Sequence, residues 1–343
     1  MSIPEVGPAP THGSEPASER FYEIAGRRLS IEAEAGSAGN LASAYVRGFH
    51  LTQRPRPDAD QLDLRFRVVA DQPPLPAGLR QFEIPEGVCH ADQRRHYLDV
   101  GGSRVVVEER AARRVTVWFG EAARAPGSFA LITTMAYAMP AALRRVGLYD
   151  LHATGMVEPE SGHGFLFPGS SGSGKTSLAV RLGAAGWQYM SDDLMLLCGE
   201  RPVVEMWPLR RHFQADALSL ANCPLPRLEE AIGMVIATDP NKRRLNPTIL
   251  FPGRFVATAT PRVLCFPVVT GEGESRVEAL GQAEAMMRLV SMCPWSSYDL
   301  AAARDHLRLL GRLVRQCRLF TLRAGRDIFD SPERAGRLLA SLA

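Results

Sequence analysis

Short runs in which apolar and polar residues alternate fill the first third of the chain, and this pattern is typical of half-buried β-strands. Proline or glycine clusters separate the runs, as expected where one strand turns into the next. The pattern predicts strands at 62–69, 80–84, 95–100, 103–108 and 115–119. The pair Gly101-Gly102 predicts a tight hairpin turn between the third and fourth of these strands.

A different pattern begins at residue 128, where apolar residues recur at helical spacing. The recurring residues are Leu131, Met135, Met139, Leu143 and Val146. They predict a helix over 128–147, with Pro140 as the point where it kinks or divides. A stripe of methionines at this spacing is more typical of a protein core than of a cofactor site, so we assign it to the core.

Strand-like and helical runs alternate through the rest of the chain, which favours an α/β fold. The predicted strands are 164–167, 188–191, 194–197 and 263–269, and the predicted helices are 175–185, 283–292, 300–316 and 332–342. Together the patterns predict three parts. These are a disordered lead-in at 1–20, a mostly β N-terminal domain with a connecting helix at 21–147, and an α/β domain at 148–343.

The composition of the 343 residues is that of a soluble globular protein, with 45% hydrophobic and 22% charged residues. The net charge of +3 is nearly balanced and the arginines are dispersed, so we expect no nucleic-acid partner. The six cysteines form no CxxC pair, which favours buried free thiols in a reducing compartment over a zinc or redox site. The chain shows neither a signal-peptide pattern nor an apolar run of about 18 residues. We therefore expect a cytoplasmic protein without a membrane partner.

One glycine-rich segment carries the clearest chemical signal, because it fits the P-loop pattern GxxxxGK[ST] at every fixed position. Its residues are Gly169, Ser170, Ser171, Gly172, Ser173, Gly174, Lys175 and Thr176. Glycines let the backbone turn N–H groups toward phosphate oxygens, and the following helix directs its positive end at the same anion. We expect Lys175 to meet the β- and γ-phosphates of a nucleoside triphosphate and the Thr176 hydroxyl to bind Mg2+.

Two neighbouring carboxylates, Asp192 and Asp193, follow the next predicted strand. In parallel α/β sheets this end of a strand lies beside the phosphate-binding loop. One carboxylate suits Mg2+, directly or through water, and the other suits the proton of an attacking hydroxyl. A solvated pair that caps a turn is the alternative. The distance of one strand–helix unit from the P-loop favours the catalytic interpretation.

Three linked pieces of the sequence resemble the HPr kinase/phosphorylase family. The likeness is closer to its shorter, divergent relatives from bacterial biosynthetic clusters, some of which phosphorylate a serine of a ribosomal peptide. The pieces are Leu151-His152-Ala153, the strand and P-loop from Gly164 to Thr176, and Gly186-Trp187-Gln188-Tyr189-Met190-Ser191-Asp192-Asp193. The last piece is similar to the G-x-x-x-x-x-D-D segment of the family. The resemblance covers residues 148–197, and a weaker likeness continues through 257–269 and 280–289.

The resemblance implies a P-loop kinase core related to HPr kinase and phosphoenolpyruvate carboxykinase, preceded by the mostly β N-terminal domain. It implies ATP and Mg2+ as cofactors, with Asp192 as the acid/base aspartate and Asp193 as its acidic neighbour at the metal. His152 resembles the active-site histidine of the family. Taken alone, such a histidine is more often an ordinary core or loop residue.

The sequence also departs from the family. Its better-known members carry an acidic segment followed by Arg-Gly, which belongs to their dual kinase and phosphorylase activity. Only the segments 204–206 and 209–211 are loose counterparts here, and the N-terminal half does not match the regulatory domain of the family. These departures leave phosphorolysis, and HPr itself as a substrate, without support.

Lys242-Arg243-Arg244 is the one compact basic cluster, and Asp239-Pro240-Asn241 before it predicts a loop. A basic residue on such a loop, for which we select Arg243, would neutralise charge on a transferring phosphoryl group as an arginine finger does. A solvated charged loop explains the cluster equally well. Arg210 and Arg211 are weaker candidates for the same role.

The leading hypothesis is an ATP-dependent serine kinase that transfers the γ-phosphoryl group to a hydroxyl of a peptide or small protein. The alternatives are a P-loop NTP hydrolase or switch and a nucleotide-binding scaffold with little turnover. The identity of the phosphoacceptor, the role of the N-terminal half and homo-oligomer formation are left open, because surfaces that select partners carry no motif.

Overall fold

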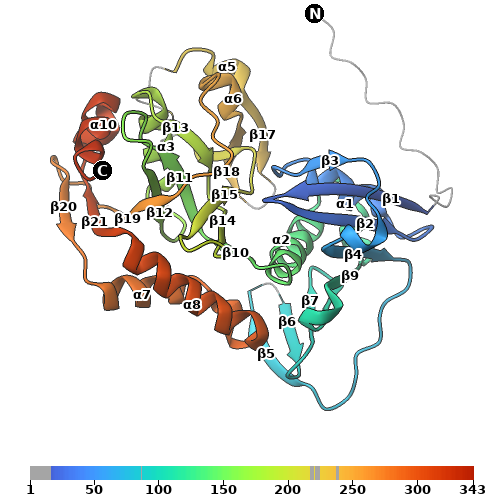
Figure 1. Ribbon diagram of the computed structural model, residues 1–343. Coiled ribbons are helices and arrows are strands. Elements are labelled where there is room, and N and C mark those ends of the chain that lie inside the picture. Colours follow the sequence, from blue (N-terminus) through green and yellow to red (C-terminus); the bar gives the residue numbers. More distant parts are fainter. Residues whose placement is uncertain (1–16, 86, 217–219, 221–224, 237–238) are drawn as a thin grey trace, which may run out of the picture.

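A computed structural model describes residues 17–85, 87–216, 220, 225–236 and 239–343 (Figure 1). Within these residues the chain is a mixed α/β structure with four β-sheets. Most of the lead-in expected at 1–20 lies outside the described residues, and a β-strand begins at Ser18. The division into domains at 147–148 stays a prediction.

The first half of the chain builds a nine-stranded sheet. Its strands are β1 Ser18–Ile24, β2 Arg27–Ala33, β3 Thr52–Arg54, β4 Leu64–Val69, β5 Arg80–Ile84, β6 Gly87–Ala91, β7 His96–Val100, β8 Ser103–Val107 and β9 Arg114–Trp118. They pair in the order β3-β1-β2-β4-β9-β8-β7-β6-β5. The five strands that alternation predicted are confirmed. In β4, β7, β8 and β9 one face packs on the core, whereas β5 has no fully buried residue. In β4, for example, Leu64, Phe66 and Val68 are buried.

The hairpin predicted between β7 and β8 is also confirmed. Gly101 and Gly102 join the two strands with φ angles of 57° and 71°. Glycine adopts this left-handed region without the steric cost that a Cβ atom brings.

Helix α2, Phe129–Arg144, corresponds to the predicted helix at 128–147. Ser128 caps it, since its hydroxyl accepts a hydrogen bond of 3.1 Å from the backbone N–H of Leu131. Pro140 lies inside the helix and does not divide it. Met135 and Met139 are fully buried, which confirms the methionine stripe as core. The helix packs against β8, β9 and β10 (Leu148–Leu151), so it lies between the two halves of the chain (Figure 1).

The second half contains a six-stranded sheet. Its strands are β11 Ala153–Val157, β12 Gly164–Pro168, β13 Gln188–Ser191, β19 Pro261–Val269, β20 Arg276–Ala279 and β21 Arg318–Ala324, in the order β13-β11-β12-β19-β21-β20. Strands β12, β19 and β21 run parallel, whereas β11 is antiparallel to both of its neighbours. As a result β12 and β13 point in the same direction although β11 separates them. The segments that follow β12 and β13 therefore leave the sheet at the same edge.

Two three-stranded sheets and a set of helices complete the second half. The sheets are β10-β14-β15, with β14 Met195–Cys198 and β15 Glu205–Pro208, and β16-β18-β17, with β16 Phe213–Asp216, β17 Ile232–Ile236 and β18 Asp239–Leu245. Within the described residues, the other α-helices are α1 Gly39–Val46 in the first half, then α3 Lys175–Ala184, α5 Leu228–Ala231, α6 Pro247–Leu250, α7 Gln282–Ser291, α8 Leu300–Gln316, α9 Arg326–Asp330 and α10 Pro332–Ala340. Helices α3, α7, α8 and α10 confirm the four predicted helices.

One local prediction is wrong. The segment 239–241, expected to be a loop, is the beginning of β18. This strand is the centre of its sheet and pairs with β16 on one side and β17 on the other. Pairing with two neighbours therefore overrides the turn preference of the local sequence.

Buried apolar residues form two clusters within the described residues. The larger joins both halves of the chain and includes Phe66, Met139 and Leu196, and the smaller surrounds α3 and β12. Cys89, Cys198, Cys265, Cys293 and Cys317 are buried free thiols, as expected, while Cys223 lies outside the described residues. No helix in the described part of the chain combines the length and the apolar character needed to span a membrane.

Candidate functional site

The glycine-rich segment forms the connection between β12 and α3. Strand β12 ends at Pro168 and α3 begins at Lys175, which confirms the strand–loop–helix order. Gly172 and Gly174 have φ angles of 82° and 91°, and a Cβ atom on Gly174 would lie 2.8 Å from Val269 Cγ2. Both positions therefore require glycine. The loop leads directly into the N-terminal end of α3, where backbone N–H groups and the helix dipole favour an anion.

Lys175 is buried against this loop, with 5% of its surface exposed. Its Nζ donates hydrogen bonds of 2.7 and 2.9 Å to the backbone oxygens of Gly169 and Ser170, and it lies 3.6 Å from Asp193 Oδ1. Burial lowers the pKa of Lys175, and the charges of Asp193 and Asp192 oppose that shift. The loop and the carboxylates together hold the ammonium group in one place.

Asp192 directly follows β13 and is fully buried. Its Oδ1 accepts a hydrogen bond of 2.6 Å from the Thr154 hydroxyl. Its Oδ2 accepts one of 2.8 Å from the Thr176 hydroxyl and one of 3.1 Å from the backbone N–H of Gln214. Burial, together with the charge of Asp193, raises the pKa of Asp192, and the hydrogen bonds oppose that shift. The carboxylate is thus fixed beside the threonine of the glycine-rich loop.

Asp193 has a left-handed backbone with φ 66°, which is uncommon for a residue other than glycine. Its Oδ1 lies 2.5 Å from His152 Nε2, and its Oδ2 lies 3.6 Å from Arg210 Nη1. Burial alone would raise the pKa of Asp193. The hydrogen bond and charge of His152, with the charges of Arg210 and Lys175, instead hold this pKa well below its usual range. Adjacent aspartates with opposite pKa shifts are a common feature of functional sites.

Arg210, a weak candidate from the sequence, lies beside Asp193 because several contacts hold its backbone. The Ser191 hydroxyl accepts a hydrogen bond of 3.0 Å from the Arg210 N–H and donates one of 3.1 Å to the Arg210 oxygen. Arg210 also forms a β-bridge with Phe49 from the first half of the chain. Its neighbour Arg211 donates to the backbone oxygens of Phe49 and Leu51 and does not approach the aspartates through any described contact.

The basic cluster at 242–244 lies on β18, and strand alternation divides its members. Lys242 and Arg244 share one face of the strand, and Arg243, the residue selected from the sequence, lies on the other. Lys242 Nζ lies 3.4 Å from the Ser171 hydroxyl in the glycine-rich loop. Arg244 lines a cavity together with Asp193 and Arg210. The structure therefore brings Lys242 and Arg244, rather than Arg243, toward the site.

Two cavities border the acidic pair, and both are lined by Asp193, Arg210, Ala136 and Tyr137. One has a volume of about 380 Å³ and is also lined by His152, by Ile84 of β5, and by Trp295 from the turn that precedes α8. The other has a volume of about 440 Å³ and is lined by aromatic residues of the first half. Both halves of the chain therefore contribute side chains to the surroundings of Asp193.

The site residues fit Mg2+, which prefers oxygen ligands and usually takes one or two protein ligands plus phosphate oxygens. Thr176 Oγ1 and Asp192 Oδ2 lie 2.8 Å apart. Neighbouring oxygens of an octahedron with bonds of about 2.1 Å lie about 3 Å apart, so this pair matches adjacent ligand positions. Within the described residues, no group of three or more His, Cys, Asp or Glu side chains is placed to hold a metal by itself.

Sequence reasoning missed three contributors, namely Thr154, the backbone N–H of Gln214, and Lys242. Thr154 lies within a buried strand and Gln214 contributes only backbone, so neither carries a motif. Lys242 was noted only as a member of the basic cluster, and recognising 239–245 as a strand would have separated it from Arg243.

Comparisons with known proteins add little to this site. No protein-family model and no curated protein matches the chain. One similar solved structure is the HPr(Ser) kinase/phosphatase from Coxiella burnetii, with 17% sequence identity. The match covers 38% of this chain and 77% of that chain, with a TM-score of 0.24. A TM-score this low supports no conclusion about fold or function, so any proposal about function depends on the residues of the site.

Proposed function

We propose that the chain is an ATP-dependent kinase that transfers the γ-phosphoryl group to a serine hydroxyl of a peptide or small protein. The hydrogen bond between Thr176 and Asp192 carries this proposal, because it joins a phosphate-binding loop to an acidic pair in one site. Phosphoryl transfer needs both a metal ligand and a group that orients or deprotonates the nucleophile. The resemblance of residues 148–197 to the HPr kinase/phosphorylase family, with its P-loop core, supports the same activity and supports ATP as the nucleotide.

The geometry favours a division of roles between the two aspartates that reverses the expectation from the family. Asp192 is bonded to Thr176 and does not line either cavity, which supports Asp192 as the Mg2+ ligand. Asp193 lines both cavities and its low pKa keeps it ionised, so its position supports Asp193 as the group that meets the acceptor hydroxyl. His152 then orients Asp193 through their hydrogen bond.

In the proposed step the acceptor oxygen bonds to the γ-phosphorus while the bond from that phosphorus to the bridging oxygen of ADP breaks. The proton of the acceptor hydroxyl passes to Asp193. Lys175 and Arg210 supply positive charge to the phosphoryl oxygens. Thr176 and Asp192 would hold Mg2+, which would supply positive charge to the β- and γ-phosphates. Lys242, at the glycine-rich loop, adds a further cation near the same phosphates.

The cavities beside Asp193 favour a kinase over an NTP hydrolase. Their volumes of about 380 and 440 Å³ are in the range of sites that enclose part of an organic ligand. A water nucleophile needs no such space. Phe129 and Val235 border the larger cavity and are about half exposed, which suits apolar side chains beside the acceptor serine.

A transfer assay tests the proposal. Purified protein with Mg2+ and ATP labelled at the γ-phosphate is offered serine-containing peptides, including those encoded beside the gene, and Lys175→Ala serves as the inactive control. We expect the wild-type chain, and not Lys175→Ala, to transfer the label to a peptide serine. Phosphate release that no peptide accelerates would identify a hydrolase instead. Nucleotide binding without turnover would identify a scaffold.

A further inference from the structure

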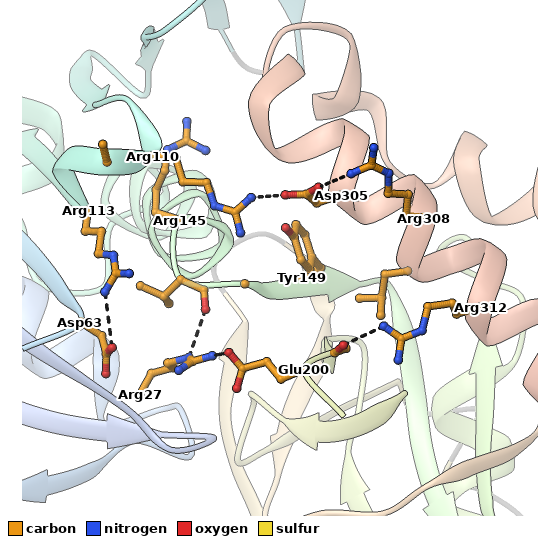
Figure 2. Close-up of a pocket in the computed structure, with 15 residues that line it drawn as sticks. Arg27, Asp63, Arg110, Arg113, Arg145, Tyr149, Glu200, Asp305, Arg308 and Arg312 are labelled. Carbon is orange, nitrogen blue, oxygen red and sulfur yellow. Dashed lines mark hydrogen bonds and ion pairs between the residues drawn. The ribbon is translucent and has the colours of Figure 1, made fainter. Parts of the chain in front are cut away.

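A cavity of about 670 Å³ lies apart from the glycine-rich loop (Figure 2). Its wall comes from the beginning of β2, the segment 110–113, the C-terminal end of α2, β10 and α8, with further residues at 63 and 199–200. It shares no lining residue with the two cavities beside Asp193. Its volume is typical of small-molecule sites.

Positive charge dominates the lining of this cavity. Six arginines and three carboxylates line it, and one of the arginines, Arg145, is also paired with the buried Asp299 outside the lining. The charged lining residues are Arg27, Arg110, Arg113, Arg145, Arg308 and Arg312, with Asp63, Glu200 and Asp305. Figure 2 shows these side chains around one opening, and they come from segments far apart in the sequence. Such convergence of arginines is the arrangement that proteins use to bind phosphate and carboxylate groups.

The carboxylates compensate these arginines only in part. Asp305 is shared, because it forms ion pairs with both Arg110 and Arg308. Arg312 donates hydrogen bonds to three backbone oxygens, of 2.7 Å to Gly199, of 2.9 Å to Pro202, and a third to Arg201. Within the part of the chain that the structure describes, Arg312 has no ion pair with a carboxylate. The charge on this guanidinium therefore remains available to an anion.

A buried tyrosine hydroxyl provides an independent indication of a ligand. Tyr149 lines the cavity and is 5% exposed, and its hydroxyl makes no hydrogen bond of normal geometry among the described residues, although the Arg110 guanidinium lies close enough to interact with it. The Tyr149 ring stacks on His306 and His306 stacks on Trp295, each with ring centroids 5.1 Å apart, so the ring is packed on that side. A buried hydroxyl without a hydrogen bond of normal geometry is costly, and a bound water, ion or ligand is a common explanation.

We propose that this cavity is a second binding site, for a small polyanion that carries closely spaced phosphate or carboxylate groups. Arg312, with Arg110 and Arg308, supplies the charge, and the Tyr149 hydroxyl donates a hydrogen bond to an anionic oxygen. The site does not depend on the proposed kinase activity. Tyr149 and Asp150 are neighbours on β10. Asp150 lines the cavity that His152 and Asp193 also line, so one strand contacts both the proposed kinase site and the second site.

Calorimetric titration tests the second site with pyrophosphate and with citrate as probes. The measurements use the full chain carrying Lys175→Ala, which weakens phosphate binding at the glycine-rich loop. We expect one remaining site for at least one probe. Adding Arg312→Gln weakens that site by about tenfold or more, and adding Tyr149→Phe weakens it by a smaller factor. If only pyrophosphate binds, the site takes a phosphorylated ligand. If only citrate binds, the site takes a polycarboxylate. If both bind, the site selects its ligand by charge.

Arg315→Gln is the matched control, because Arg315 is exposed on the same helix and does not line the cavity. It should leave probe affinity unchanged. Thermal melting of each variant checks that the fold is intact, and Tyr149→Phe keeps the ring and its stacking. Absence of binding for both probes would overturn the proposal. So would binding that neither Arg312→Gln nor Tyr149→Phe weakens.

Discussion

The hydroxyl of Thr176 donates a hydrogen bond of 2.8 Å to Asp192, a residue 16 positions further along the chain. Thr176 belongs to the first turn of α3, and Asp192 follows β13, so the bond closes one strand–helix unit onto itself. Thr154 holds the second oxygen of the same carboxylate. The position of the loop threonine therefore depends on a buried aspartate outside the glycine-rich motif.

The roles proposed for the two aspartates predict different responses to Mg2+. Asp192→Asn removes a charged metal ligand, so we expect a higher Mg2+ concentration for half-maximal transfer. Asp193→Asn removes the group that meets the acceptor, so we expect kcat to fall by about 10²–10⁴-fold with little change in Mg2+ requirement. Transfer rates measured across a Mg2+ series check this. A raised Mg2+ requirement in Asp193→Asn alone would restore the assignment from the family.

Thr154 is a positioning residue, and its role is visible in the pH profile of transfer. Its hydroxyl donates to the ionised form of Asp192 and so lowers the pKa of that carboxyl. Thr154→Val keeps the shape but removes the donor, so the pKa of Asp192 rises further. The acid limb of the rate profile then moves to higher pH. Thr154→Ser retains the hydroxyl and should restore the wild-type profile.

Asp193 makes stability depend on pH at the acid end. Its folded-state pKa is depressed below the unfolded value of about 3.9, so its contribution is present at neutral pH and disappears as the pH falls below that value. Asp193→Asn should lower the free energy of unfolding by about 1–3 kcal/mol at pH 7. Asn tolerates the left-handed backbone, so lost charge alone is tested.

Urea unfolding at pH 7 and pH 3 checks this prediction. The difference between wild type and Asp193→Asn should shrink at the lower pH, where the carboxyl of the unfolded wild-type chain takes up a proton while the folded one is still ionised. The exposed Asp60 is a suitable control, since Asp60→Asn should change stability at neither pH. An equal loss at both pH values would show that the variant acts through packing instead of charge.

Arg210 should matter more to transfer than the basic residue that the sequence favoured. Arg210→Gln is expected to lower kcat by about 10³-fold, the effect of losing an arginine that contacts the phosphoryl group. Arg243→Gln should change kcat little, because Arg243 lies on the opposite face of β18 from Lys242 and Arg244. Steady-state kinetics of the two variants decide the matter. A larger loss in Arg243→Gln would contradict the assignment.

Asp299 is predicted to be important for stability. It is buried and lies 3.0 Å from Arg145 Nη1 and 3.6 Å from Arg144 Nε, so its removal leaves two buried guanidinium groups with less compensation. Asp299→Asn should reduce the free energy of unfolding by about 3–5 kcal/mol. Urea titration measures the loss. Glu230→Gln, which breaks an exposed pair with Arg227, should have no measurable effect.

Sequence reasoning found the parts of the site that short-range patterns encode. Lys175 and Thr176 have fixed places in a loop motif, and Asp192 follows from the length of one strand–helix unit. The prediction that this carboxylate would return to the loop is confirmed, although the intervening β11 runs antiparallel and was not foreseen. Strand β11 is antiparallel to both β12 and β13, so β12 and β13 point in the same direction and the loop and the carboxylate lie at the same edge of the sheet.

The remaining parts depend on contacts between distant segments. Arg210 reaches Asp193 because Ser191 and Phe49 hold its backbone, and Phe49 is about 160 residues away in the sequence. The choice between Arg243 and its neighbours depends on strand alternation, which the turn-forming residues before it concealed. Local patterns carry no information about either relationship.

The pairing of β12 with β19 has a consequence for the newly made protein. Phe165 pairs with Val263, so the ribosome completes almost one hundred further residues before the strand that carries the glycine-rich segment gains its second neighbour. At typical rates of synthesis this takes about 5–20 seconds. During that interval an apolar strand has a free edge, and such edges attract other chains. Slower production or co-expressed chaperones should therefore raise the yield of folded protein more than changes to the purified sample do.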